Sequence, residues 1–316
     1  MDAPQQSADG QVYVSLAQLM ALEFAARGLS FIARQPRASL LSGNHASHLR
    51  GRGLDFDELR RYQPGDDLRH LDCKASLRSG TPIVRTWTEE RDRPLLLVLD
   101  QRMSMFFGSR VSFKSAIAAE LAALCAWIGL KAGDRVGAVV FDDHECQCLS
   151  PLRSRARLQA ICATATRFNH GLAADVPAGD SRQSLDNALQ RCLQLARHDH
   201  LVCVISDFAG ASDTTLKQLR QLRAHNDVLA LQVFDPLALD LPQQGRLVIS
   251  QGRLQVALAM ERQRIRQPLS DFLGGRLKDV AHLLRRSQVP LLMFSTALPA
   301  AAQLRLELGR LRELKP

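Results

Sequence analysis

The stretch that decides the fold is residues 94–104, Pro-Leu-Leu-Leu-Val-Leu-Asp-Gln-Arg-Met-Ser. Its run of aliphatic residues does not alternate with polar ones, which is typical of a parallel strand covered on both faces. The run ends at Asp100, where a polar loop begins. Because ligands of parallel sheets bind beyond the carboxyl ends of the strands, we expect the functional site there.

Similar apolar runs recur along the chain. We expect further buried strands at residues 136–141, 201–205, 228–234 and 289–295, and a short edge strand at 146–149. Helical patterns separate or follow them at residues 112–130, 153–167, 184–197, 212–224 and 299–314. Strands that alternate with helices predict βαβ units, so the fold class is α/β with a mainly parallel, Rossmann-type sheet flanked by helices.

The composition divides the chain into three parts. Residues 1–93 form an N-terminal helical and β extension with a helix expected at 12–34, and residues 94–240 form the α/β domain. Residues 241–316 form a basic C-terminal extension that completes the domain. It contains an expected hairpin, and then a helix at 259–286 that Pro268 breaks or kinks.

The overall composition excludes several classes of protein. With 46% hydrophobic residues the chain can bury a large core, and with only 5% aromatic residues that core is aliphatic. No apolar stretch reaches the roughly 20 residues of a membrane span, and the polar first residues lack the features of a signal peptide. We therefore expect a cytoplasmic protein without membrane insertion. Seven scattered cysteines fit that compartment, and no zinc-site spacing follows Cys146 and Cys148.

The net charge of +9 resides in the last part of the chain. Residues 241–316 carry 13 Lys and Arg against 5 Asp and Glu, whereas the rest is nearly balanced. Such a segment attracts acidic proteins or nucleic acids. Nucleic-acid binding is therefore an alternative function, although Phe272 and Phe294 are the segment's only rings for stacking on bases.

The sequence does not predict an enzyme. It contains no Walker loop, no Gly-x-Ser-x-Gly elbow, no Gly-x-Gly-x-x-Gly and no His-Glu-x-x-His, and its nine histidines are dispersed. The expectation is a protein that binds another protein.

The most specific stretch is residues 53–76, Gly-Leu-Asp-Phe-Asp-Glu-Leu-Arg-Arg-Tyr-Gln-Pro-Gly-Asp-Asp-Leu-Arg-His-Leu-Asp-Cys-Lys-Ala-Ser. Its Pro-Gly pair suits a type II turn, and its interleaved arginines and aspartates predict ion pairs. The network either fastens the N-terminal segment to the α/β domain or forms a docking face for a partner. The residues in question are Arg60, Tyr62, Asp66, Asp67, Arg69 and Asp72.

This stretch resembles the bacterial family known as domain of unknown function 58, which is often linked to MoxR-type AAA+ ATPases. The family carries such a Pro-Gly-Asp block before a von Willebrand factor A-like domain, and the likeness extends through residues 95–100 and 205–208. Cys73 departs from it, since the family usually has tryptophan there. The chain is similar to the short, soluble branch. The resemblance implies an adaptor or chaperone-like partner of the ATPase, which matures or remodels other proteins through the top of the sheet.

The resemblance also implies a metal-ion-dependent adhesion site at the top of the sheet. Von Willebrand factor A-like domains hold a divalent cation such as Mg²⁺ through Asp-x-Ser-x-Ser, a later threonine and a later aspartate. Asp100, Ser104 and Asp207 match these ligands, and Ser184 substitutes for the threonine. Arg102 does not match, because it places a cation with five donors where the family has a hydroxyl.

Two alternatives follow for this degenerate site. Either Arg102 pairs with Asp100 and Asp207 and metal binds weakly or not at all, or Arg102 points outward and Mg²⁺ still binds. Asp142 and Asp143, which follow the next strand, are interpreted as caps of the local turn.

Overall fold

The computed structural model describes residues 12–31, 54–89, 93–174, 181–244, 246–251 and 254–313. The chain forms two compact units. Residues 1–34 and 93–316 make up the first, here called the α/β unit, and residues 35–92 make up the second, here called the small unit.

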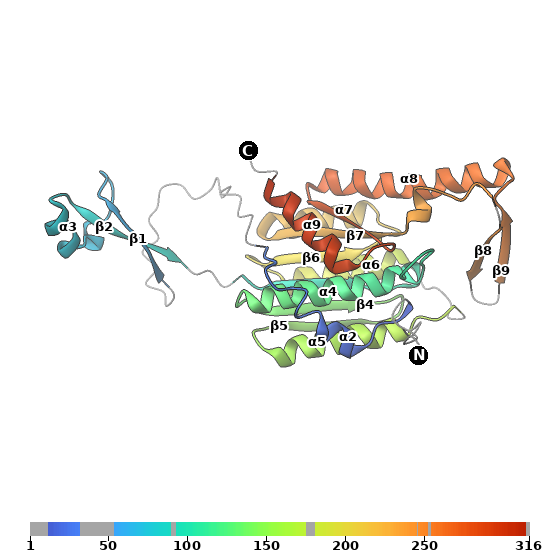
Figure 1. Ribbon diagram of the computed structural model, residues 1–316, viewed down its shortest axis with the longest axis horizontal. Coiled ribbons are helices and arrows are strands. Elements are labelled where there is room, and N and C mark those ends of the chain that lie inside the picture. Colours follow the sequence, from blue (N-terminus) through green and yellow to red (C-terminus); the bar gives the residue numbers. More distant parts are fainter. Residues whose placement is uncertain are drawn as a thin grey trace, which may run out of the picture. The chain divides into compact units, whose positions relative to one another are not determined.

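A six-stranded sheet forms the centre of the α/β unit, with strand order β10-β7-β6-β3-β4-β5 (Figure 1). All neighbours are parallel except β5, which pairs with β4 antiparallel at the edge. This confirms the expected fold class. The strands are β3 (Leu95–Asp100), β4 (Val136–Phe141), β5 (Cys146–Leu152), β6 (Leu201–Ser206), β7 (Asp227–Phe234) and β10 (Leu291–Ser295).

Helices cover both faces of the sheet (Figure 1). One face packs against α2 (Leu16–Ala21), α4 (Lys114–Lys131), α5 (Arg155–His170) and α9 (Ala300–Glu313). The other packs against α6 (Ser181–Leu195), α7 (Asp213–His225) and α8 (Gln263–Ser287). The described residues also include short 3-10 helices, namely η1 (Leu68–His70) in the small unit and η2 (Met103–Met105) and η3 (Pro236–Ala238) in the α/β unit.

The uninterrupted apolar sequence of β3 explains why this strand lies inside the sheet with both faces covered. Leu95, Leu97 and Leu99 belong to the core under α4, whereas Leu96 and Val98 belong to the core under α6. The strand needs apolar residues at every position because both faces are covered. Helix α4 is buried on nearly all sides for a similar reason, since α2, α5 and α9 cover the side that faces away from the sheet.

The C-terminal part of the chain supplies the edge strand β10 and helix α9. Strands β8 (Arg246–Gln251) and β9 (Leu254–Ala259) form a separate antiparallel pair, the expected hairpin. Helix α8 contains Pro268 but continues to Ser287, so the expected break is not found. No helix in the described part of the chain is long and apolar enough to cross a membrane.

The small unit consists of β1 (Leu54–Arg61), η1, α3 (Cys73–Ser79) and β2 (Ile83–Glu89), with β1 and β2 antiparallel. A turn follows β1, in which the Asp66 amide donates to the Gln63 carbonyl at 3.0 Å and Gly65 has φ 107°. The Pro-Gly pair thus makes the predicted turn, because glycine tolerates positive φ.

The N-terminal extension differs from the expectation in two ways. Residues 1–34 belong to the α/β unit, so residues 1–93 are not one piece. The expected helix at 12–34 is reduced to α2, after which the chain makes irregular turns up to Gly28, with φ 74°. Buried Val14, Leu19 and Ala26 fix this path against α4 and α5, and tertiary packing therefore outweighs the helical pattern.

Candidate functional site

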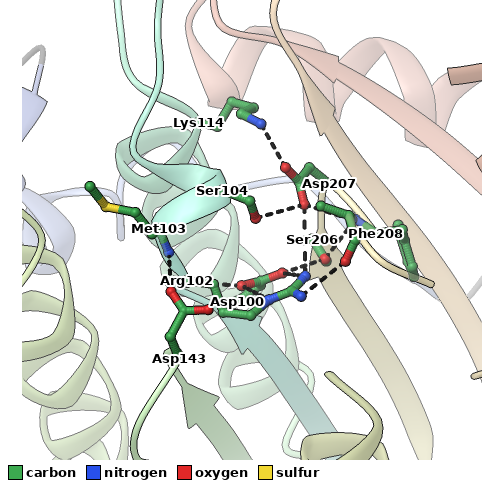
Figure 2. A network of polar contacts seen from close by, with 10 residues as sticks. Asp100, Arg102, Met103, Ser104, Lys114, Asp143, Ser206, Asp207 and Phe208 are labelled. Carbon is green, nitrogen blue, oxygen red and sulfur yellow. Dashed lines mark hydrogen bonds and ion pairs between the residues drawn. The ribbon is translucent and has the colours of Figure 1, made fainter. Parts of the chain in front are cut away.

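The candidate site lies at the carboxyl ends of β3, β4 and β6 (Figure 2). Asp100 is the last residue of β3, and Ser206 and Asp207 lie at the end of β6. Asp143 follows β4, and the loop between β3 and α4 contributes Arg102. The parallel register brings these ends to one edge of the sheet.

Arg102 turns inward and is held on several sides. Its Nε donates to Asp100 Oδ1 at 2.9 Å, and its Nη2 donates to Asp100 Oδ2 at 2.6 Å. Its Nη1 donates to the Ala209 carbonyl at 3.0 Å, and Nη2 lies 3.8 Å from Asp207 Oδ1. The guanidinium also lies over the Phe141 ring, 5.6 Å from its centroid. This bidentate geometry fixes the guanidinium as a built-in cation of the site.

The pair is sealed from water, since the side chains of Asp100 and Arg102 are both 0% exposed. Burial alone would lower the pKa of Arg102, but the charge of Asp100 and its hydrogen bonds outweigh this and raise that pKa above its usual value. Arg102 therefore carries its charge at every physiological pH. Ser206 completes the shell of Asp100 by donating its hydroxyl to Oδ2 at 2.5 Å.

A second cation, Lys114, neutralises Asp207. Lys114 is the first residue of α4, and its Nζ lies 2.6 Å from Asp207 Oδ2. Asp207 Oδ1 accepts from the Ser104 hydroxyl at 3.2 Å and from the Ala209 amide at 2.9 Å. Burial would raise the pKa of Asp207, but Lys114 and Arg102 together lower it to about 2. The carboxylate is therefore charged and fully partnered.

These residues do not fit a divalent cation such as Mg²⁺. Both oxygens of Asp100 already accept two hydrogen bonds each, and both oxygens of Asp207 accept at least one. The guanidinium of Arg102 lies between the two carboxylates, where it would repel Mg²⁺ and offers no acceptor. Within the described ranges, no group of three or more His, Cys, Asp or Glu residues is arranged to hold a metal ion.

The other predicted residues at the carboxyl ends of the strands lie around the pair of Arg102 and Asp100. The Ser184 hydroxyl donates to the Asp143 carbonyl at 3.4 Å. Asp142 acts as the turn cap that was expected, because it accepts from the amides of His144 and Glu145. The carboxylate of Asp143 accepts from the Met103 amide at 2.6 Å and thereby ties the end of β4 to the loop after β3.

The predicted ion-pair block lies in the small unit, and the ion pairs described below are formed within that unit. Arg60 binds Asp66 bidentately at 2.7 and 2.8 Å, and Arg69 pairs with Asp67 at 2.6 Å. Asp72 caps α3 through the Ala75 amide and pairs with an arginine of β2. Arg60 lowers the pKa of Asp66 through its hydrogen bonds, and Arg69 does the same for Asp67.

The sixth residue of the block, Tyr62, has a backbone role. Its amide donates to the Pro82 carbonyl at 2.9 Å, which extends the pairing of β1 and β2 by one residue.

Two contributors were missed by the sequence reasoning. Lys114 follows a phenylalanine in no recognisable motif, so only the fold brings it to Asp207. Ser206 could have been found, since it is the polar residue that ends an apolar strand beside Asp207.

A buried hydrogen-bond chain also joins the site to the N-terminal segment. Gln101 Oε1 accepts from Asn169 Nδ2 at 3.3 Å, and Asn169 Oδ1 accepts from the Val14 amide at 2.9 Å.

The fold and the site together define the class. This is an α/β protein with a mainly parallel six-stranded sheet, in which an arginine occupies the centre of the site at the carboxyl ends of the strands. The chain belongs to the family described as "Protein of unknown function DUF58", whose profile matches residues 58–272. This confirms the resemblance found in the sequence.

The relatives extend the likeness over most of the chain. "Uncharacterized protein Mb1516" of Mycobacterium bovis and "Uncharacterized protein Rv1480" of Mycobacterium tuberculosis are each 28% identical over 276 residues, which cover 87% of this chain and 85% of theirs. Among solved structures, BatB from Bacteroides thetaiotaomicron gives a TM-score of 0.41 at 10% identity, covering 70% of this chain and 99% of BatB. An aerotolerance-related membrane protein from Bacteroides fragilis gives 0.40 at 14% identity, covering 69% and 99%.

Proposed function

We propose that this chain is a non-enzymatic binding partner of a MoxR-type AAA+ ATPase, and that it contacts proteins through the carboxyl end of its sheet without a metal ion. The observation that carries the proposal is Arg102, buried between Asp100 and Asp207. It supplies from within the chain the positive charge that a bound cation supplies in metal-dependent domains of this fold. The top of the sheet is thereby held in one arrangement at all metal concentrations.

The surface beside the site supports a protein contact. The loop between β3 and α4 carries Phe107 and Val111, which are 38% and 47% exposed. Ser109, Arg110 and His144 are exposed polar residues of the same end of the sheet. Apolar side chains within a polar rim are typical of protein interfaces.

The chemistry of the site argues against catalysis. Ser104 is the candidate nucleophile, and its hydroxyl donates to Asp207. A carboxylate whose pKa is lowered to about 2 is a poor general base at neutral pH, because the best base has a pKa near the working pH. Lys114 is engaged as well, because its Nζ lies 2.6 Å from Asp207 Oδ2 in an ion pair.

The test is a direct binding measurement between the purified full chain and a MoxR-type ATPase from the same organism, by biolayer interferometry, without nucleotide and with ATP or ADP. We expect binding that Phe107→Ser with Val111→Ser abolishes. Leu152→Ser is the matched control, because Leu152 is 48% exposed but pairs with Val136 at the opposite end of β4. Without nucleotide, EDTA and Mg²⁺ should give equal affinities. Absence of binding in every nucleotide state would sink the proposal.

The nucleic-acid alternative stays a prediction. Arg276, Lys278, Arg285 and Arg286 are exposed on α8 and could neutralise phosphates. Gel-shift assays with DNA and RNA at low ionic strength decide it: a shift that a Lys278→Glu, Arg285→Glu variant loses would favour this function over the adaptor.

A further inference from the structure

The small unit carries two neighbouring hollows around helix α3. The first has a volume of about 430 Å³ and is lined by Leu59, Asp72, Lys74, Ala75, Arg78 and Ser79. The second has a volume of about 300 Å³ and shares Asp72 and Lys74 with the first. Because two residues line both hollows, the hollows adjoin and together form one shallow, open depression, here called the α3 groove.

The unpaired charge of the α3 groove is positive. Asp72, its acidic residue, is neutralised by Arg85 at 2.8 Å. Lys74 and Arg78 lie four residues apart on α3, so they lie one above the other on the same face of the helix. Neither side chain has an ion-pair or hydrogen-bond partner among the described residues. Two cations therefore face the groove without a compensating carboxylate.

Exposed leucines accompany these cations. Leu59 lines the groove and is 46% exposed, and Leu77 on α3 is 86% exposed. Leu68, at the start of η1, is 66% exposed. Of these three leucines only Leu59 lines the groove, so Leu59 is the apolar side chain that a ligand in the groove would cover.

We propose that the α3 groove binds an acidic segment of a partner protein in which Asp or Glu residues stand next to Leu or Phe. The carboxylates would pair with Lys74 and Arg78, and an apolar side chain would cover Leu59. This proposal is independent of the one above, because it concerns other residues in the other unit. Either one can fail alone.

Two other occupants fit the groove less well. A nucleic acid would use the cations but leaves Leu59 unexplained, and among the residues that line the hollows only His70 offers a ring for base stacking. An anionic membrane surface would use the cations, but only one of the three leucines, Leu59, lines the groove, whereas insertion into a membrane surface needs several apolar side chains together.

The probe is a fluorescein-labelled twelve-residue peptide in which Asp and Glu alternate with Leu, added to the full-length chain and followed by fluorescence anisotropy. We expect saturable binding that weakens as salt is added, because exposed charges are screened. The double variant Lys74→Glu, Arg78→Glu should weaken the affinity about tenfold or more. Leu59→Ser should weaken it about threefold, since it removes apolar contact without changing charge.

Three controls make the result decisive. Lys217→Glu with Lys278→Glu changes the net charge by the same amount on exposed residues of the α/β unit, and should leave the affinity unchanged. Thermal unfolding should show that Lys74→Glu, Arg78→Glu folds like the parent, because neither side chain has an ion-pair or hydrogen-bond partner among the residues that the structure describes. A peptide with Ser in place of Leu should bind much more weakly.

The proposal is overturned if the acidic peptide binds no better than its serine counterpart, or if the groove and control variants lose equal affinity. Tighter binding to phosphatidylserine vesicles or to single-stranded RNA, lost in Lys74→Glu, Arg78→Glu, would also overturn it and would assign the groove to that ligand.

Discussion

Two arginine–aspartate pairs in this protein share one geometry but differ in surroundings. Arg102 and Asp100 in the α/β unit lie 2.6 Å apart, as do Arg69 and Asp67 in the small unit. The first pair is 0% exposed on both sides, whereas the second is 70% and 32% exposed. Water screens the exposed pair, so it shapes a loop locally; the buried pair has no substitute for its partner. The comparison shows that burial, not the distance between the charges, decides which pair controls the fold and the site.

The largest effect is expected from removing the cation of the buried pair. Arg102→Met leaves Asp100 charged and buried with only hydroxyl and amide donors, so the free energy of unfolding should fall by about 3–5 kcal/mol. Urea unfolding at neutral pH measures it. In a double-mutant cycle with Asp100→Asn, the two losses should be strongly non-additive, because each change removes the same interaction. A loss below about 1 kcal/mol would show that burial does not govern this pair.

The second buried carboxylate, that of Asp207, is tested through the pH dependence of the free energy of unfolding. Its folded pKa is lowered from 3.8 to about 2, so its contribution to stability is complete above 3.8 and is lost as the pH falls towards 2. Asp207→Asn should cost about 2 kcal/mol at pH 7, a difference that shrinks below pH 4. Urea unfolding from pH 7 to pH 3 measures this. Asp142→Asn is the control, since asparagine can still accept the two turn amides and should show no such pH dependence.

Glu120 on α4 tests the effect of burial on a carboxyl group for which the structure describes no cationic partner. Burial raises the pKa of Glu120 to about 7, only partly offset by a hydrogen bond from the Ala300 amide, and no ion-pair partner lies among the described residues. Because a raised folded pKa favours the neutral acid, its stabilising effect is complete below pH 4.5 and is lost as the pH rises through 7. Glu120→Gln should therefore raise the free energy of unfolding by about 2 kcal/mol at pH 8 and change little at pH 4.5. An equal change in the free energy of unfolding at pH 8 and at pH 4.5 would contradict a raised pKa for Glu120.

The smallest effect is expected at the exposed pair. Arg69→Ala should leave the unfolding midpoint of the full chain unchanged within error, because solvent already screens the pair. Measurements at low and high salt should agree. A clear loss of stability at low salt would break the comparison and would show that the small unit depends on its surface charges.

The sequence pattern was sufficient for the sheet. Continuous apolar runs such as Leu95 to Leu99 predicted parallel strands, because a strand covered on both faces has no polar side. The site could also be located, since Asp100 and Asp207 end such runs and Arg102 lies two residues beyond one of them. What the pattern missed depends on distant parts of the chain. Lys114 reaches Asp207 only through the direction of α4, and the path of the N-terminal segment depends on packing of Val14 and Leu19 that no local period reveals.

The most direct test of the account is calorimetric titration of the full chain with Mg²⁺ and with Mn²⁺. We predict no binding in the millimolar range to the natural chain, because Arg102 already neutralises Asp100 and lies beside Asp207. Arg102→Ser, which restores the hydroxyl and removes the cation, should gain a measurable site. Sub-millimolar binding to the natural chain would contradict the claim that arginine has taken the place of the metal.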